Sequence, residues 1–81
     1  MCYYVYILKS QRDGRLYKGI SKHPTLRLNE HNAGKTKSTK GYRPWKLVLK
    51  EKFHSRNEAR KREIFLKSGS GREYLKNILD L

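Results

Sequence analysis

Residues 2–9, CYYVYILK, restrict the fold of this chain more than any other segment, because most of them are β-branched, aromatic or aliphatic. Such a run predicts a β-strand with apolar side chains on both faces. Asp13-Gly14 then predicts a turn, since glycine accepts positive φ and aspartate can bond its own backbone. Residues 15–21 predict the returning strand. The chain should therefore open with an antiparallel hairpin.

The middle of the chain predicts a helix, a loop and a further strand. Pro24 suits a first helical turn, the helix continues from Leu26 to Asn32, and Gly34 is a candidate for the left-handed position after its end. Residues 35–43 carry four Lys/Arg and no acidic residue, which predicts a basic loop rather than a core element. Residues 45–53 alternate between apolar and charged side chains, as a half-exposed strand does.

Two helices are expected to complete the chain. Ser55 and Glu58 have the spacing of a capping box, so the main helix should begin there and run to about Lys67. Ser68-Gly69-Ser70-Gly71 predicts a break. A last helix from Arg72 to Leu79 would then turn three apolar side chains to the core: Leu75, Ile78 and Leu79. The resulting order, ββαβαα, predicts an α+β fold in which helices flank a small three-stranded antiparallel sheet.

Length and charge narrow the class of protein. The 81 residues suit a single domain over residues 1–81, since typical domains have roughly 100–150 residues. Twenty Lys and Arg against seven Asp and Glu give a net charge of +13, which favours a polyanionic partner such as a nucleic acid. Aromatic residues make up 11% of the chain, whereas disordered basic tails lack them, so the chain should be folded.

The sequence also indicates which cellular compartment the protein occupies and which kinds of metal site it lacks. A single cysteine, Cys2, excludes an intramolecular disulfide and a cysteine-based zinc site, and it fits a reducing compartment. His23, His31 and His54 lack the spacing of metal ligands. No apolar run approaches the roughly 18 residues of a membrane span, and the chain begins directly in a strand-like segment. We therefore expect a cytoplasmic protein without a membrane partner.

Glu63 is the residue that fits a simple core pattern least. It follows Ala59 and precedes Leu66 on one stripe of the predicted main helix, within a strongly basic segment. A carboxylate at the edge of a core needs an arginine, a metal ion or a hydrogen-bond donor beside it. A structural salt bridge with a helix arginine would satisfy it as well as a catalytic role would.

Other candidates are individually weak. Arg27 and His31 share a helix face, which could equally be a solvated surface pair. Tyr6 and Tyr17 could simply be strand aromatics. Gly19 is unusual, because a glycine inside a strand often marks the close approach of another group. In the basic loop, phosphate contact is the simpler interpretation for its four cations, although such loops can also be merely solubilising: Lys35, Lys37, Lys40 and Arg43.

The order of these residues resembles the GIY-YIG nuclease family. The resemblance rests on Tyr4-Val5-Tyr6, Tyr17-Lys18-Gly19, Arg27 with His31, and Glu63 within Ala-Arg-Lys-Arg-Glu. The chain looks most like the small single-domain branch related to the N-terminal nuclease module of an excinuclease. Its departures are Tyr4, Val5 and Lys18, where the family has Gly, Ile and Ile, and none of these positions carries the chemistry. Asn77 is given no role.

The resemblance implies a catalytic site of Tyr6, Tyr17, Arg27, His31 and Glu63. Glu63 would bind one divalent ion, Mg²⁺ or Mn²⁺, which acts as a Lewis acid at the scissile phosphate. Tyr17, helped by Tyr6 or a basic group, would orient or deprotonate the attacking water. Arg27 would clamp the phosphate, and His31 would serve in proton transfer or hydrogen bonding.

The function expected from this resemblance is a metal-dependent endonuclease that hydrolyses DNA phosphodiester bonds in repair or processing. Two alternatives stay open. One is a non-catalytic nucleic-acid-binding module, for DNA or RNA, on the same fold. The other is an RNA-binding or ribosome-associated protein, for which the charge of +13 would suffice. Only the endonuclease needs Glu63 and a divalent ion.

Overall fold

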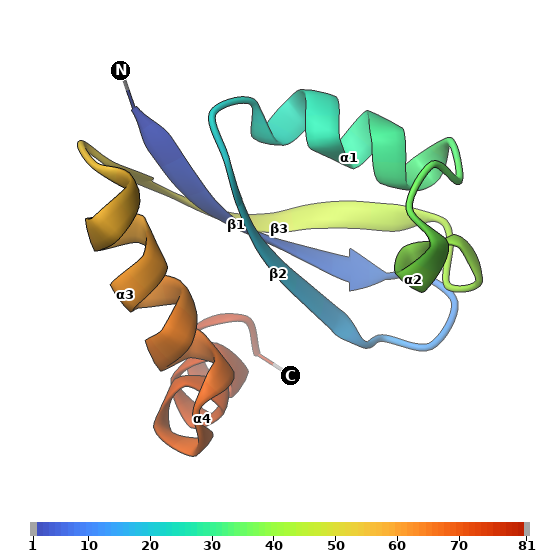
Figure 1. The fold of residues 1–81 in the computed structure, drawn as a ribbon. Coiled ribbons are helices and arrows are strands. Elements are labelled where there is room, and N and C mark those ends of the chain that lie inside the picture. Colours follow the sequence, from blue (N-terminus) through green and yellow to red (C-terminus); the bar gives the residue numbers. More distant parts are fainter. Residues whose placement is uncertain (1, 81) are drawn as a thin grey trace.

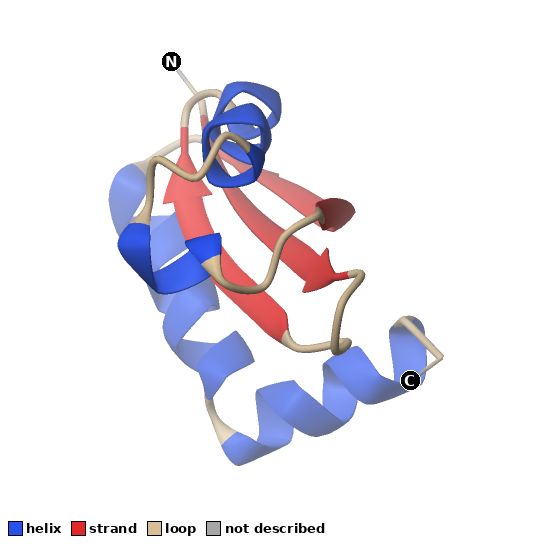
Figure 2. Cartoon of the chain, turned by 90° about the vertical axis from the view of Figure 1, so that its right-hand side faces the viewer, coloured by secondary structure: helices blue, strands red, loops and turns tan. Residues whose placement is uncertain are grey.

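The computed structural model describes residues 2–80 and contains a three-stranded antiparallel sheet between two helical layers. Its elements follow the chain in the order β1 (Tyr3–Ser10), β2 (Leu16–Ser21), α1 (Pro24–Asn32), α2 (Lys37–Lys40), β3 (Trp45–Phe53), α3 (Arg56–Lys67) and α4 (Gly69–Ile78). Figure 1 shows this path. Helices α1 and α2 lie on one face of the sheet, and α3 and α4 cover the other (Figure 2). The predicted α+β class is confirmed.

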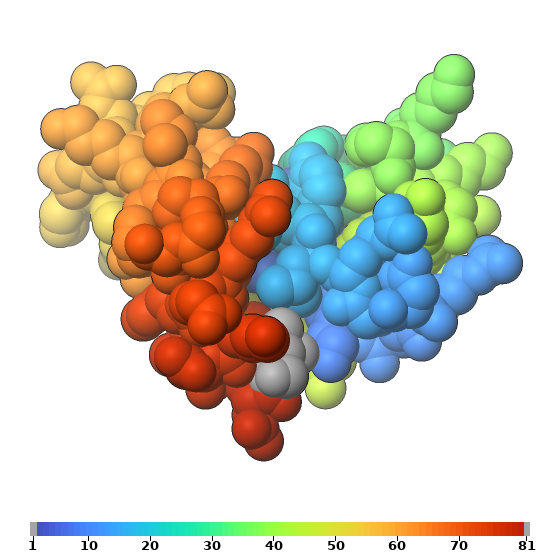
Figure 3. All heavy atoms as spheres, turned by 90° about the horizontal axis from the view of Figure 1, so that it is seen from below, coloured from blue at the N-terminus to red at the C-terminus, as the bar shows by residue number. Residues whose placement is uncertain are grey.

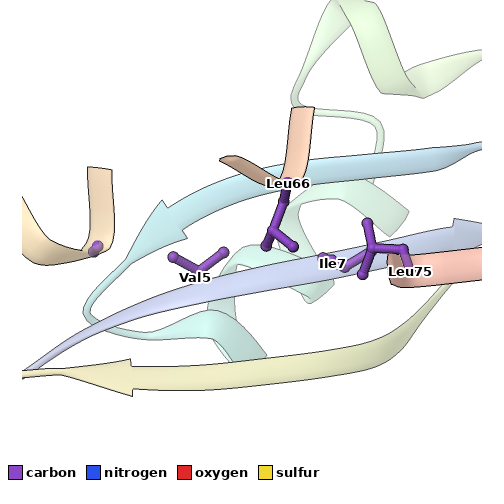
Figure 4. Packing of buried hydrophobic residues seen from close by; sticks show 5 residues of the cluster. Val5, Ile7, Leu66 and Leu75 are labelled. Carbon is purple, nitrogen blue, oxygen red and sulfur yellow. The ribbon is translucent and has the colours of Figure 1, made fainter. Parts of the chain in front are cut away.

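Strand β1 is the centre of the sheet, which has the order β2-β1-β3. Its apolar run suits this position, because consecutive residues of a strand point to opposite faces and can all be buried only if both faces are covered. Val5 and Ile7 pack with Leu66 of α3 and Leu75 of α4 (Figure 4). Tyr6 and Leu8, on the other face, pack around Trp45 together with Leu28 of α1 and Tyr17.

The chain's turn and capping signals account for most element ends. Gly14 and Gly34 have φ of +80° and +79°, as a hairpin turn and a helix end require. The Oγ of Ser55 accepts a hydrogen bond from the amide of Glu58 at 3.2 Å and so begins α3. None of the described residues belongs to a helix long and apolar enough to cross a membrane.

Three sequence-based expectations were wrong in part. The segment 35–43 is not simply a basic loop, because it contains α2 and buries Thr39. The break at residues 68–71 is a single residue, because Ser68 caps α4 and the helix begins at Gly69. Of the three apolar residues expected in the core from α4, Leu75 is buried, Leu79 packs partly against the core, and Ile78 is 45% exposed.

Candidate functional site: the hollow between strand β2 and helix α3

A hollow of about 280 Å³ lies where helix α3 passes edge strand β2. Figure 3 shows the notch between the orange atoms of α3 and the light-blue atoms of β2. Four separate elements supply its walls: β1 contributes Tyr6, β2 contributes Tyr17 and Gly19, α1 contributes Arg27, and α3 contributes Glu63. Ile20 and four basic side chains complete the lining, the basic ones being Lys18, Arg56, Arg60 and Lys67. We refer to it as the β2–α3 hollow.

Gly19 allows the Tyr6 side chain to reach the β2–α3 hollow. The two residues are cross-strand partners in the β1–β2 ladder, and the Tyr6 phenol lies across the backbone of Gly19. A Cβ at position 19 would be 2.7 Å from the Tyr6 Oη and 2.8 Å from its Cζ. The close approach inferred from the sequence is therefore that of the Tyr6 hydroxyl.

Gly19→Ala is expected to displace the Tyr6 phenol, because a Cβ never approaches a ring this closely and the backbone of β2 cannot yield without breaking its pairing with β1. We expect destabilisation of about 1–3 kcal/mol and loss of whatever activity depends on Tyr6. Denaturant unfolding measures the loss of stability. Gly41→Ala is the matched control, since a Cβ there meets nothing within 4 Å.

His31 lies behind Tyr6 rather than in the wall of the hollow. Its side chain is completely buried, although the sequence also allowed a solvated pair with Arg27. The His31 Nε2 is 3.3 Å from the Tyr6 Oη, and its Nδ1 is 2.8 Å from the Thr39 Oγ1. The ring of Tyr17 lies 4.6 Å from the imidazole, centroid to centroid. His31 therefore connects the aromatic wall of the hollow to helix α2.

Burial keeps His31 neutral near pH 7. It lowers the pKa of His31 below 6.5, and the nearby Arg27 guanidinium lowers it further, against a smaller opposite effect of Glu30. Because its usual pKa is near 6.5, a neutral imidazole at this site can accept a proton.

His31 should also make stability depend on pH. As pH falls below about 6.5, the unfolded chain binds a proton at His31 before the folded protein does, so the free energy of unfolding decreases by up to about 1.4 kcal/mol per pH unit. Above that pH the effect vanishes. Urea unfolding between about pH 7.5 and 5.5 measures it, and His31→Asn should flatten the dependence. An equal slope in both proteins would contradict this assignment.

Arg27 faces the hollow from the first helix. Its Nη1 donates a hydrogen bond of 2.6 Å to the Glu30 Oε1, one turn further along α1, which holds the guanidinium beside Tyr6. Burial raises the pKa of Tyr6, while the guanidinium acts in the opposite direction. Tyr6 therefore keeps its proton near neutral pH. The guanidinium has further N–H groups that could bind an anion.

Glu63 brings a buried carboxylate to the opposite wall. The residue is only 7% exposed, and its two oxygens are paired with cations of the same helix. The Arg60 Nη1 lies 3.0 Å from the Oε1, and the Lys67 Nζ lies 3.3 Å from the Oε2. The salt bridge considered from the sequence is thus present. It does not decide whether Glu63 has a further role, because Arg60 and Lys67 are themselves largely exposed and can move.

The four predicted phosphate-binding cations of the basic segment lie outside the β2–α3 hollow. Lys37 instead borders a larger hollow of about 750 Å³ between the hairpin turn and α2, with Arg12 and Tyr42. Arg43 donates a hydrogen bond to the carbonyl oxygen of Lys40, and Lys35 is exposed. No candidate catalytic side chain borders the larger hollow, so we do not assign the chemistry to it despite its size.

The donor set limits what metal the β2–α3 hollow could hold. Among residues 2–80, no three His, Cys, Asp or Glu side chains are grouped as a metal cage. Glu63 supplies a single carboxylate. That suits Mg²⁺, which keeps several waters and binds through one or two carboxylates plus substrate phosphates. The residues present therefore fit a hydrated hard cation that shares Glu63 with a phosphate, and they do not fit an all-protein site.

Sequence reasoning missed Thr39 and the basic wall of the hollow. Thr39 is 2% exposed and bonds His31, yet it lies in a segment whose lysines suggested only a loop. No alternation of apolar and polar residues surrounds Thr39, so the sequence pattern gives no sign that this residue is buried. In the sequence, Lys18 is notable only as a departure from the family motif, and Arg56 and Arg60 do not stand out from the strongly basic segment around Glu63.

Known proteins match this chain over most of its length. A family model described as the GIY-YIG catalytic domain matches residues 2–76. The chain is 44% identical over 77 residues to a UPF0213 protein of Staphylococcus haemolyticus, with 94% of this chain and 93% of that protein covered. It is 39% identical over 77 residues to a UPF0213 protein of Staphylococcus aureus, with the same coverage.

A solved structure is also similar. The solution NMR structure of a UPF0213 protein from Bacillus halodurans matches with a TM-score of 0.58 and 36% sequence identity, covering 96% of this chain and 85% of that one. The names of these relatives state no activity. What they support is the family and the fold, and the chemistry must be argued from the hollow itself.

Proposed function

The chain belongs to the GIY-YIG family, and from that premise we propose that it is a metal-dependent endonuclease that hydrolyses phosphodiester bonds of DNA during repair or processing. The observation that carries the proposal is the convergence of Tyr6, Tyr17, Arg27 and Glu63, from four different elements, on one basic hollow. A set of aromatic hydroxyls, a guanidinium and a buried carboxylate around one concave surface is the constellation that phosphoryl transfer needs.

Arg27 and Glu63 would act on the phosphate from opposite walls. The Arg27 fork can bind two phosphate oxygens and stabilise the charge that grows on them as the phosphorus is attacked. Glu63 would hold Mg²⁺ or Mn²⁺. When bound, the ion supplies Lewis-acid stabilisation of the leaving oxygen. Arg60 and Lys67 pair with Glu63 in this structure. Both cations would have to release the carboxylate before it could bind the ion.

The aromatic wall would handle the proton of the attacking water. Tyr17 faces the hollow and would orient or deprotonate that water. Tyr6 keeps its own proton near neutral pH, so its role is to hold Tyr17 and to pass a proton onward. The neutral His31 imidazole, 3.3 Å from the Tyr6 Oη, is the proton acceptor at the end of this path.

A non-catalytic nucleic-acid-binding module is the second candidate. The double ion pair of Glu63 favours it, because both carboxylate oxygens already have partners without a metal ion. Such a module would bind DNA or RNA through the same basic walls.

Incubation of the purified protein with supercoiled plasmid separates the two functions. The endonuclease should convert plasmid to nicked or linear forms in Mg²⁺ or Mn²⁺ and should stop when EDTA is added. A binding module should retard the plasmid in gels without cutting it in either condition. Absence of cutting in both metals, with retardation retained, would overturn the proposed activity.

A further inference from the structure

Lys18 occupies a position that the sheet otherwise gives to apolar residues. Strand β2 directs Leu16, Lys18 and Ile20 toward α3 and α4, because alternate residues of a strand share a face. Leu16 and Ile20 pack there against the core that contains Val5, Ile7 and Leu66. Lys18, between them, is half-buried. Its methylene stem can cover core surface, but that alone requires no ammonium group.

The surroundings of the Lys18 ammonium are unfavourable for a cation. Among the described residues 2–80, the Lys18 ammonium makes no hydrogen bond or ion pair. Its charged neighbours are Lys67, at the end of α3, and Arg72, in the first turns of α4. Burial, and then the charges of Arg72 and Lys67, lower the pKa of Lys18. Lys67 is paired with Glu63, but among the described residues neither Lys18 nor Arg72 has an ion pair, and an anion would stabilise both charges.

This cation cluster adjoins the site of the proposed chemistry. Lys18 and Lys67 line the β2–α3 hollow together with Tyr17 and Glu63. Lys18 is next to Tyr17 along β2 but faces the opposite side of the sheet, so the cluster lies on the α3–α4 side of the hollow, whereas Arg27 lies on the α1 side. Consecutive phosphates of one strand would therefore meet cations on both sides of edge strand β2.

We propose that Lys18 and Lys67 form a second phosphate subsite, which binds a backbone phosphate adjacent to the one held at Arg27 and Glu63. The charge of Arg72, at the start of α4, adds to the positive potential there. The inference rests on the proposed function in one respect, namely that the substrate is a nucleic-acid strand. It goes beyond that function by giving the strand a direction: from α1, across β2, to the junction of α3 and α4. It also gives Lys67 a partner once it releases Glu63.

Lys18→Ile tests the subsite, because it restores the apolar pattern and removes one charge. We expect higher thermal stability together with weaker DNA binding. Loss of one phosphate contact should lower the slope of log affinity against log salt by about 0.9, which corresponds to roughly a ten-fold weaker affinity at about 0.05 M salt and little difference near 1 M. Fluorescence anisotropy with a labelled duplex, in EDTA, measures this without cleavage.

Lys46→Ile is the matched control. It removes the same charge from an exposed position on β3, at the opposite edge of the sheet and outside the hollow. Lys18→Met, which keeps the unbranched stem, serves if the isoleucine variant folds poorly. Equal affinities and salt slopes for the Lys18 and Lys46 variants would overturn the subsite. The binding assay does not depend on cleavage. A wild-type protein that binds DNA through Lys18 but does not cut it would therefore contradict the proposed endonuclease activity and still support the subsite.

Discussion

Glu63→Gln should abolish plasmid nicking while the fold and the affinity for DNA are retained. Glutamine keeps the shape and hydrogen-bonding capacity of the side chain but removes the charge that would hold a divalent ion. Removal of a negative charge from a site for phosphate should leave DNA affinity equal or higher. Nicking assays and anisotropy on the same preparations measure the two effects.

The ion pairs of Glu63 set how much stability this substitution can cost. Arg60 and Lys67 have side chains that are 64% and 53% exposed, so each pair is well solvated on one side. We expect the free energy of unfolding to fall by about 1 kcal/mol or less. Thermal melts distinguish this small loss from failure to fold. If Glu63 were only a structural partner of these cations, the melting temperature would fall slightly and nicking, where the wild type shows it, would persist.

Glu58→Gln provides the control on the same helix. Glu58 is exposed in the first turn of α3 and does not line the hollow. Its neutralisation changes the net charge by the same amount and costs only the interaction with the helix N-terminus, about 0.3–1 kcal/mol. A Glu63→Gln protein that nicks plasmid as fast as Glu58→Gln would sink the assignment of Glu63 as a metal ligand.

Local signals in the sequence predicted the fold well because they act within a few residues. The apolar run of β1, the turn at Gly14 and the cap at Ser55 each specify an element without reference to distant parts of the chain. The helix pattern alone drew attention to Glu63, whereas Tyr6, Tyr17 and Arg27 were weak candidates until the resemblance to a family linked them. The structure brings all four to one hollow. Their roles stay proposals.

Contacts between distant segments explain what the sequence did not predict. Thr39 is buried because it meets His31 and the Trp45 indole, whose Nε1 donates to the Thr39 carbonyl oxygen at 2.9 Å. Nothing in the pattern of residues 35–43 encodes these partners. Helices α1 and α3 also reach the same edge strand, β2, from opposite faces of the sheet. Only the three-dimensional path around β2 gives that arrangement.

The glycines at residues 69 and 71 are a further case in which the sequence does not reveal the contacts. Composition alone suggested that both break the helix. In the structure both belong to α4, and they differ in what surrounds them. A Cβ on Gly69 would meet nothing within 4 Å, whereas one on Gly71 would lie 2.5 Å from the Leu66 Cα and would collide with the carbonyl oxygen of Phe65. Gly71 therefore permits the tight reversal between α3 and α4.

Gly71→Ala should consequently destabilise the protein strongly. The overlap is with backbone, which cannot rotate away as a side chain can, so α4 must move off the end of α3 and uncover Leu66 and Leu75, both completely buried. We expect a loss of about 3 kcal/mol or more, a large part of the roughly 4–12 kcal/mol available to a chain of this size. The melting temperature should fall by at least about 10 °C.

Gly69→Ala isolates the collision from the intrinsic effect of alanine. Alanine is favoured over glycine in a helix by up to about 1 kcal/mol, so this variant should be as stable as the wild type or slightly more stable. Both substitutions add one methyl group to the first turn of the same helix, so the difference between their unfolding free energies measures the contact at Phe65 and Leu66. Equal midpoints for the two variants would show that α4 does not pack against α3 at Gly71, and the α3–α4 side of the hollow, with Arg72, would then need to be placed anew.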